Sequence, residues 1–143
     1  MSPRLIAYVL VALGALVVVL TRIRMRREGA AGVHQVPRGV VLGHTVSGVL
    51  GLVSWLAYLL THGHDTTLGV DRELVGIVAL ACLWILSVLG LMILLRWLPS
   101  RGRHASAATE DSWSDGPGLS VLAHVGMFLA VAFFTISYML NTL

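Results

Sequence analysis

The sequence predicts an all-α integral membrane protein, built as an up-down four-helix bundle without a sizeable soluble domain. Apolar residues make up 57% of the 143 residues and charged residues only 12%, against roughly 45–50% and 25% in soluble domains. The apolar residues also gather in four long runs. Each run is long enough to cross a hydrocarbon core of about 30 Å, which takes about 17–25 helical residues.

The four runs have no charged residue in their interiors, and none alternates between apolar and polar residues as a barrel strand would. Backbone groups in lipid must be hydrogen-bonded within their own segment, so we expect each run to be a helix. The first run follows Arg4 and precedes a cluster of arginines without a small-residue cleavage site. We therefore expect a retained anchor rather than a cleaved signal peptide. The expected helices are residues 5–21, 39–61, 74–95 and 119–143, within a single domain 1–143.

The basic residues, all arginines, set the expected orientation. The loop 22–38 carries five arginines and the loop 96–118 carries three, whereas the other side holds only Arg4 and Arg72 beside three acidic residues. Because cytoplasmic loops are enriched in basic residues, we expect both loops in the cytoplasm and both termini outside. The chain is then a multi-pass protein of the plasma membrane. Its net charge of +3 reflects topology, and no nucleic-acid partner is expected.

Several classes of chemistry find no support in the sequence. The single cysteine, Cys82, lies inside an apolar run and cannot form an intrachain disulfide. There is no Walker loop, dinucleotide fingerprint, paired-cysteine metal site or catalytic triad, so no hydrolytic or transferase site is evident. The apolar runs also lack an acidic residue, which disfavours a small ion-coupled transporter.

Two histidines lie inside the expected helices at matching depths. His44 is about five residues from the cytoplasmic end of the second run, and His124 is equally far from that end of the fourth. The second and fourth helices of an up-down bundle are diagonal, and neighbouring axes about 8–10 Å apart put that diagonal at roughly 12–14 Å. This separation suits two imidazoles that bind one haem iron from opposite sides, and bundle cores build such sites. The pattern predicts one haem b, with His44 and His124 as its metal ligands.

Small residues surround this expected pair. Gly48 and Gly51 lie one and two turns along the helix face of His44, where missing side chains would leave room for a flat macrocycle. Gly14 and Gly90 lie at a matching depth in the first and third runs. We therefore expect Gly48 and Gly51 to line the cofactor.

Other candidate contacts of the cofactor are polar or polarizable. Met127 lies one turn from His124, and Arg38 lies at the start of the second run. Arg38, with Arg96 or Arg101, is a candidate to pair with haem propionates because arginine binds carboxylates through two parallel hydrogen bonds.

The same residues have simpler interpretations. Gly39, Gly43, Ser47 and Gly51 recur every four residues, a stripe typical of close helix packing. A buried neutral histidine can hydrogen-bond a hydroxyl or carbonyl of a neighbouring helix, and Met127 at helical spacing is typical of core packing. These interpretations predict a cofactor-free accessory or assembly subunit of a larger membrane complex.

His62 and His64 lie at the outer end of the second run. No histidine of another run lies at that depth, so a second haem is not expected. The two side chains are candidates to bind a transition metal or to contact a propionate. They are equally compatible with solvated histidines at the membrane interface.

A helix that opens with His44-Thr-Val-Ser-Gly48 and carries His62 at its far end, followed by a helix that opens with His124-Val-Gly-Met, resembles the small membrane cytochromes b. This group includes the cytochrome b561 family and related quinol-linked subunits. The resemblance implies haem ligation on a four-helix core and electron transfer, with a quinone or other subunits of a redox complex as partners. Those families commonly carry two haems, whereas this sequence offers a ligand pair for one.

Overall fold

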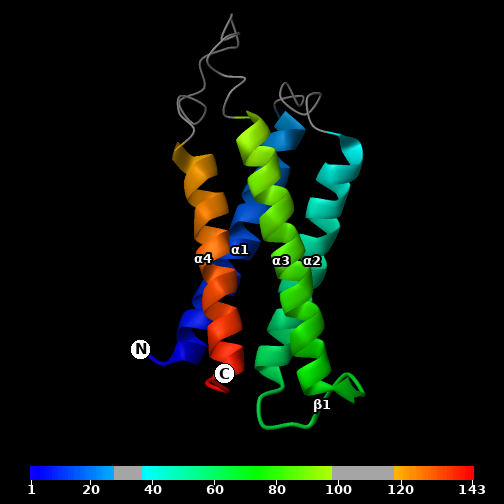
Figure 1. The fold of residues 1–143 in the computed structure, drawn as a ribbon, viewed down its shortest axis with the longest axis vertical. Coiled ribbons are helices and arrows are strands. Elements are labelled where there is room, and N and C mark those ends of the chain that lie inside the picture. Colours follow the sequence, from blue (N-terminus) through cyan, green and yellow to red (C-terminus); the bar gives the residue numbers. More distant parts are fainter. Residues whose placement is uncertain (28–36, 98–117) are drawn as a thin grey trace, which may run out of the picture.

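A computed structural model describes residues 1–27, 37–97 and 118–143 as mainly four long helices. They are α1 (Pro3–Arg27), α2 (Arg38–Leu60), α3 (Arg72–Trp97) and α4 (Gly118–Met139), and they run side by side in alternating directions (Figure 1). Both chain termini and the connection from α2 to α3 lie at one end of the bundle, called the terminal end below (Figure 1). Each helix contains a segment long and apolar enough to cross a membrane, as the sequence predicts.

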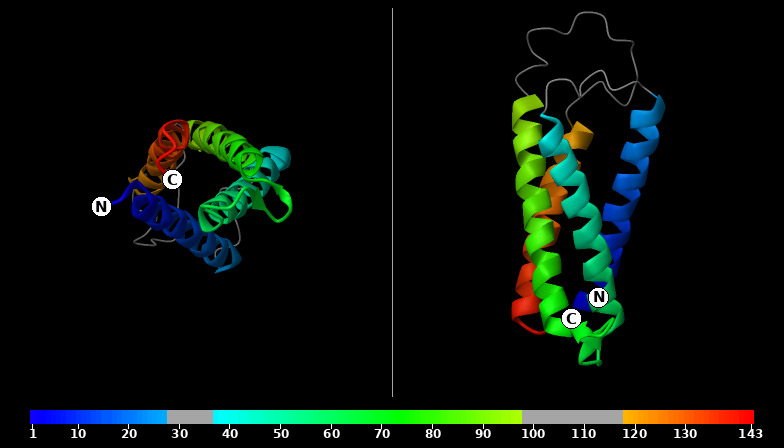
Figure 2. Two further views of the ribbon diagram at one scale, coloured as in Figure 1. Left: turned by 90° about the horizontal axis from the view of Figure 1, so that it is seen from below. Right: turned by 90° about the vertical axis from the view of Figure 1, so that its right-hand side faces the viewer.

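The helices follow one another around the bundle in chain order (Figure 2). The most extensive contact joins α2 and α3; α3 also packs on α4, and α1 packs on α2 and α4. The second and fourth helices are therefore diagonal, which is the arrangement that the histidine argument requires. The helix α1 is the most peripheral, because only 17% of its candidate membrane span is buried, against 39% for α3.

Two helix ends differ from the expectation. The helix α1 continues through the arginine cluster to Arg27, and α4 ends at Met139 rather than at the last residue. The chain turns there because Asn141 adopts a left-handed conformation with φ of 50°, which a helix C-terminus commonly uses. The Thr142 N–H donates to the Ser137 carbonyl at 3.0 Å, and the Asn141 N–H donates to the Tyr138 carbonyl at 3.0 Å. This bonding satisfies carbonyls that the end of a helix otherwise leaves without partners.

A short hairpin between α2 and α3 was not predicted from the sequence. Strand β1 (Thr66–Thr67) pairs with β2 (Val70–Asp71) in antiparallel fashion. The two intervening residues, Leu68 and Gly69, have φ of 52° and 80°, as the tight turn of a two-residue hairpin requires. Because leucine rarely adopts a positive φ, the sequence does not predict this turn.

The buried apolar core is concentrated in the half of the bundle at the terminal end. In α2 the buried apolar residues begin at Leu52, and in α4 they begin at Ala130. Large apolar side chains on the outer faces of all four helices are exposed, as a lipid-facing surface requires. The core cluster comprises Ala7, Val11, Leu52, Trp55, Tyr58, Leu59, Ala79, Leu80, Leu83, Leu86, Ala130, Val131, Phe134 and Leu143.

Candidate functional site

The structure brings His44 and His124 together in the half of the bundle opposite the terminal end. Their ring centroids are 6.2 Å apart, and the ring planes are inclined by 29°. Both side chains are half-buried. They come from the diagonal helices α2 and α4, at the common depth that counting along the sequence predicts.

One hydrogen bond fixes the orientation of His44. Its Nδ1 lies 3.1 Å from the carbonyl oxygen of Leu86 in α3. A carbonyl oxygen only accepts, so the Nδ1–H of His44 is the donor. In the neutral imidazole the proton on Nδ1 leaves a lone pair on Nε2, and the same backbone contact orients many metal-binding histidines.

Gly90 of α3 lies directly against both imidazoles. A Cβ atom at this position would come within 3.0 Å of His44 Cε1 and 2.9 Å of His124 Cδ2. Any side chain at position 90 would therefore push at least one ring away. The sequence predicted only that Gly90 lies at the depth of the two histidines. The structure shows that both imidazoles contact the α3 backbone at Gly90.

The two glycines expected to leave room beside His44 face a different neighbour. A Cβ at Gly48 would lie 3.0 Å from the Leu86 side chain, and a Cβ at Gly51 would lie 2.9 Å from the Leu83 side chain. Both leucines belong to α3. The space beside Gly48 and Gly51 is thus filled by close packing of α2 on α3, as the small-residue stripe alternatively predicts.

The remaining predicted contacts are more distant or lie at the surface. Met127 Cε would be 3.2 Å from a Cβ at Gly14, so Met127 packs against α1. Arg38 is exposed at the first residue of α2. The side chain of Arg96 and all of Arg101 fall outside the part of the chain that the structure describes.

The described residues hold no group of three or more histidine, cysteine, aspartate or glutamate side chains placed to bind a metal ion. Within residues 1–27, 37–97 and 118–143, the candidate site thus consists of two imidazoles against a glycine. Two ligands leave a simple metal ion incompletely coordinated, because zinc takes four ligands in structural sites and three in catalytic sites.

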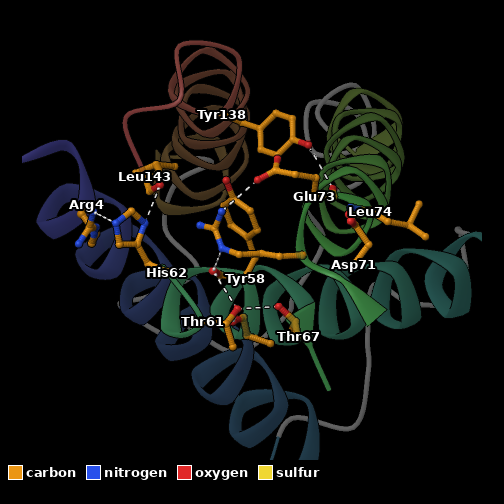
Figure 3. A network of polar contacts seen from close by, with 12 residues as sticks. Arg4, Tyr58, Thr61, His62, Thr67, Asp71, Glu73, Leu74, Tyr138 and Leu143 are labelled. Carbon is orange, nitrogen blue, oxygen red and sulfur yellow. Dashed lines mark hydrogen bonds and ion pairs between the residues drawn. The ribbon is translucent and has the colours of Figure 1, made fainter. Parts of the chain in front are cut away.

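At the terminal end, His62 has specific partners. Arg4 Nη2 donates to His62 Nε2 at 2.8 Å, and His62 Nδ1 therefore donates to the main-chain oxygen of Leu143 at 3.0 Å (Figure 3). His64 is exposed. The contacts of His62 join α1, the end of α2 and the last residue, a role that the sequence did not reveal.

Arg72, the first residue of α3, is the polar residue that sequence reasoning missed. Its side chain is 8% exposed, and its guanidinium carbon lies 3.9 Å from the centre of the Tyr58 ring. Arg72 Nε donates to the Tyr58 carbonyl at 3.3 Å, and Nη1 pairs with Glu73 Oε1 at 3.1 Å. The only signal in the sequence was one Arg-Glu pair before an apolar run.

Comparisons with known proteins yielded no match: no family model fits the chain, and neither a similar curated protein nor a similar solved structure was found. The resemblance to membrane cytochromes b therefore rests on the quoted residues alone.

Proposed function

We propose that this protein is a membrane b-type cytochrome, or an electron-transfer subunit, that binds one haem b between His44 and His124. The observation that carries the proposal is that two imidazoles from diagonal helices lie together, stacked with their centroids 6.2 Å apart. A metal–imidazole nitrogen bond is about 2.0–2.1 Å long, and a ring centroid lies about 1 Å behind its nitrogen. Two imidazoles on opposite sides of one metal thus have centroids about 6 Å apart.

The chemistry of the donors favours haem over a bare metal ion. The Nδ1–H of His44 is held by the Leu86 carbonyl at 3.1 Å, so Nε2 is the nitrogen with a free lone pair. A porphyrin supplies the equatorial ligands of its iron, so two histidines complete the coordination. Haem in turn supplies one-electron redox chemistry, and two protein ligands leave no position for oxygen.

The buried apolar side chains of α2 and α4 lie beyond the histidine pair, towards the terminal end, and this unequal burial supports room for a macrocycle at the pair. Gly90 closes the α3 side of the pair, while the apolar core begins only beyond it, at Leu52 in α2 and Ala130 in α4. We infer that His44 and His124 would hold the haem iron and that both rings would withdraw from Gly90 to admit the group.

The surroundings define the proposed partners. Arg38 is exposed at the start of α2, where it pairs with a haem propionate; an arginine fork suits a carboxylate. The arginine-rich loops lie in the cytoplasm, both termini lie outside, and lipid covers the exposed apolar faces. The electron partner is a quinone or another subunit of a membrane redox complex, as the resemblance implies.

A second candidate function is that of a cofactor-free accessory or assembly subunit. The close approach of Gly48 and Gly51 to leucines of α3 favours it, because these glycines serve helix packing. In this case the two imidazoles belong to a polar contact between helices and bind no iron.

The absorption spectrum of detergent-purified protein, produced with ample haem, distinguishes the two candidates. A b-type cytochrome shows a Soret band, split alpha and beta bands when reduced, and one iron per chain. Protein that folds and remains colourless would establish the cofactor-free subunit instead.

A further inference from the structure

A polar hollow of about 490 Å³ lies at the terminal end, away from His44 and His124. It is formed by the segment after α2, the start of α3 and the last residues of the chain (Figure 3). The residues that line it are His62, Gly63, His64, Asp65, Asp71, Arg72, Glu73, Asn141 and Leu143.

Arg72 contributes a buried cation to this hollow. Its side chain is 8% exposed, and its Nε and Nη1 atoms donate to the Tyr58 carbonyl and the Glu73 carboxylate. The Nη2 atom is buried and finds no acceptor among the described residues. A buried guanidinium N–H without an acceptor is costly, so this atom is suited to an anionic oxygen of a ligand.

The rim of the hollow carries the opposite charge. Asp65 and Asp71 are exposed, and the Glu73 side chain is 57% exposed. Asp71 Oδ1 accepts from the Leu74 N–H at 3.0 Å, and Glu73 Oε1 accepts from Arg72 Nη1 at 3.1 Å. Each of these carboxylates keeps one oxygen for a ligand, and Asp65 keeps both among the contacts of the described residues. A simple anion would be repelled by this rim, whereas a ligand that also carries a cation would be attracted.

We propose that the hollow binds a small zwitterion in which a phosphate or carboxylate stands beside a primary ammonium group. The anionic oxygens accept from Arg72 Nη2, and the ammonium group donates to Asp65 and Glu73. Charge-assisted hydrogen bonds of this kind are about twice as strong as neutral ones. Phosphoethanolamine has this chemistry, whether free in solution or as the head group of a phospholipid.

The first test is isothermal titration of the detergent-purified full chain with phosphoethanolamine, inorganic phosphate and ethanolamine. We expect saturable binding of one phosphoethanolamine per chain, at least about tenfold tighter than either fragment, which corresponds to about 1.4 kcal/mol. Equal affinity for phosphoethanolamine and phosphate, or binding of none of the three, would overturn the proposal.

Substitutions assign the two charges of the ligand to their partners. Arg72→Gln is expected to abolish phosphoethanolamine binding, whereas Arg72→Lys retains part of it. Because Arg72 also packs on Tyr58, a second variant leaves the arginine intact. Asp65→Asn, in an exposed loop, should reduce the preference for phosphoethanolamine over phosphate at least about fivefold without changing the melting temperature. An unchanged preference in Asp65→Asn contradicts the assignment of the ammonium group.

The source of the ligand is identified by repeating the titration in nanodiscs. If phosphatidylethanolamine discs suppress binding that phosphatidylglycerol discs allow, the zwitterion is a lipid head group. Equal binding in both discs assigns the hollow to a soluble zwitterion. Haem content is measured in parallel. The hollow and the histidine pair lie in opposite halves of the bundle, so a variant can lose phosphoethanolamine binding and keep haem, or the reverse. Such a result tests this proposal separately from that of the cytochrome.

Discussion

His44 shows how much of the candidate site depends on one backbone contact. The Leu86 carbonyl holds its Nδ1–H at 3.1 Å and so leaves the lone pair on Nε2. His124, on the diagonal helix, lies 6.2 Å away between ring centroids. The pairing of these two histidines was accessible from the sequence, because depth in a helix follows from counting residues.

Other residue roles were not accessible from the sequence. Which way Gly48 and Gly51 face depends on how α2 is rotated about its axis, and a helix apolar on all sides does not reveal this rotation. The burial of Arg72 depends on the Tyr58 ring beneath it, which belongs to another helix. Both facts required the packed structure.

The proposal predicts that His44→Ala and His124→Ala each abolish haem retention while the protein still inserts in the membrane. Insertion survives because removing an imidazole makes the helix more apolar. The measurement is haem per chain in purified protein, with membrane-fraction abundance as the control. A variant that keeps full haem content would exclude that histidine as a ligand.

The double replacement His62→Ala, His64→Ala is the matched control, and it should leave haem content unchanged. Neither side chain faces a histidine of another helix within the described residues, and His62 is hydrogen-bonded to Arg4 and Leu143. Loss of half of the haem absorbance would reveal a second haem at the terminal end.

At the scale of helices, glycines let α3 approach its neighbours. Gly51 faces Leu83, with a hypothetical Cβ only 3.1 Å from the Leu83 backbone nitrogen, and backbone cannot yield as a side-chain end does. Gly126 of α4 has nothing within 4 Å of such a Cβ among the described atoms. The two positions form a natural comparison.

We predict that Gly51→Ala destabilises the bundle by about 1–3 kcal/mol, the usual cost of overpacking. Gly126→Ala should be neutral or stabilising by up to about 1 kcal/mol, since alanine is the better helix former. Thermal or detergent-induced unfolding followed by circular dichroism measures both. Equal stability of the two variants would mean that α2 and α3 do not pack as described.

Gly90→Ala tests the role of α3 beneath the histidine pair. Its methyl group would lie 2.9 Å from His124 Cδ2 and 3.0 Å from His44 Cε1, in the space beside the rings that a haem held by them would need. We predict a loss of haem affinity of at least about tenfold, within the range of overpacking energies, with Gly126→Ala as the control. Unaltered haem affinity in Gly90→Ala would place the haem pocket elsewhere.

At the scale of the whole molecule, the sequence predicted four long apolar helices and their order around the bundle, and the structure agrees. Hydrophobic length alone determines the number of such helices. The hairpin β1–β2 escaped prediction because its turn places Leu68 at positive φ. The concentration of buried residues at the terminal end was not predicted either, because burial depends on how far the helices diverge.

The orientation of the chain remains a prediction from its arginines. Single cysteines placed at Thr66 and Ser106 in a Cys82→Ser background should be labelled by impermeant reagents from opposite sides of the membrane. Thr66 precedes the hairpin turn, and Ser106 belongs to the arginine-rich segment 96–118 of the sequence. Labelling of both cysteines from the same side would mean that α3, the helix between them, does not cross the membrane. That result would contradict the four-helix topology.

The electron paramagnetic resonance spectrum of oxidised, haem-loaded protein tests the central claim most directly. If His44 and His124 bind one iron from opposite sides, the spectrum contains a low-spin ferric signal with two imidazole ligands, and this signal disappears in either alanine variant. A high-spin signal in the wild-type protein, or purified protein without haem iron, would contradict the account.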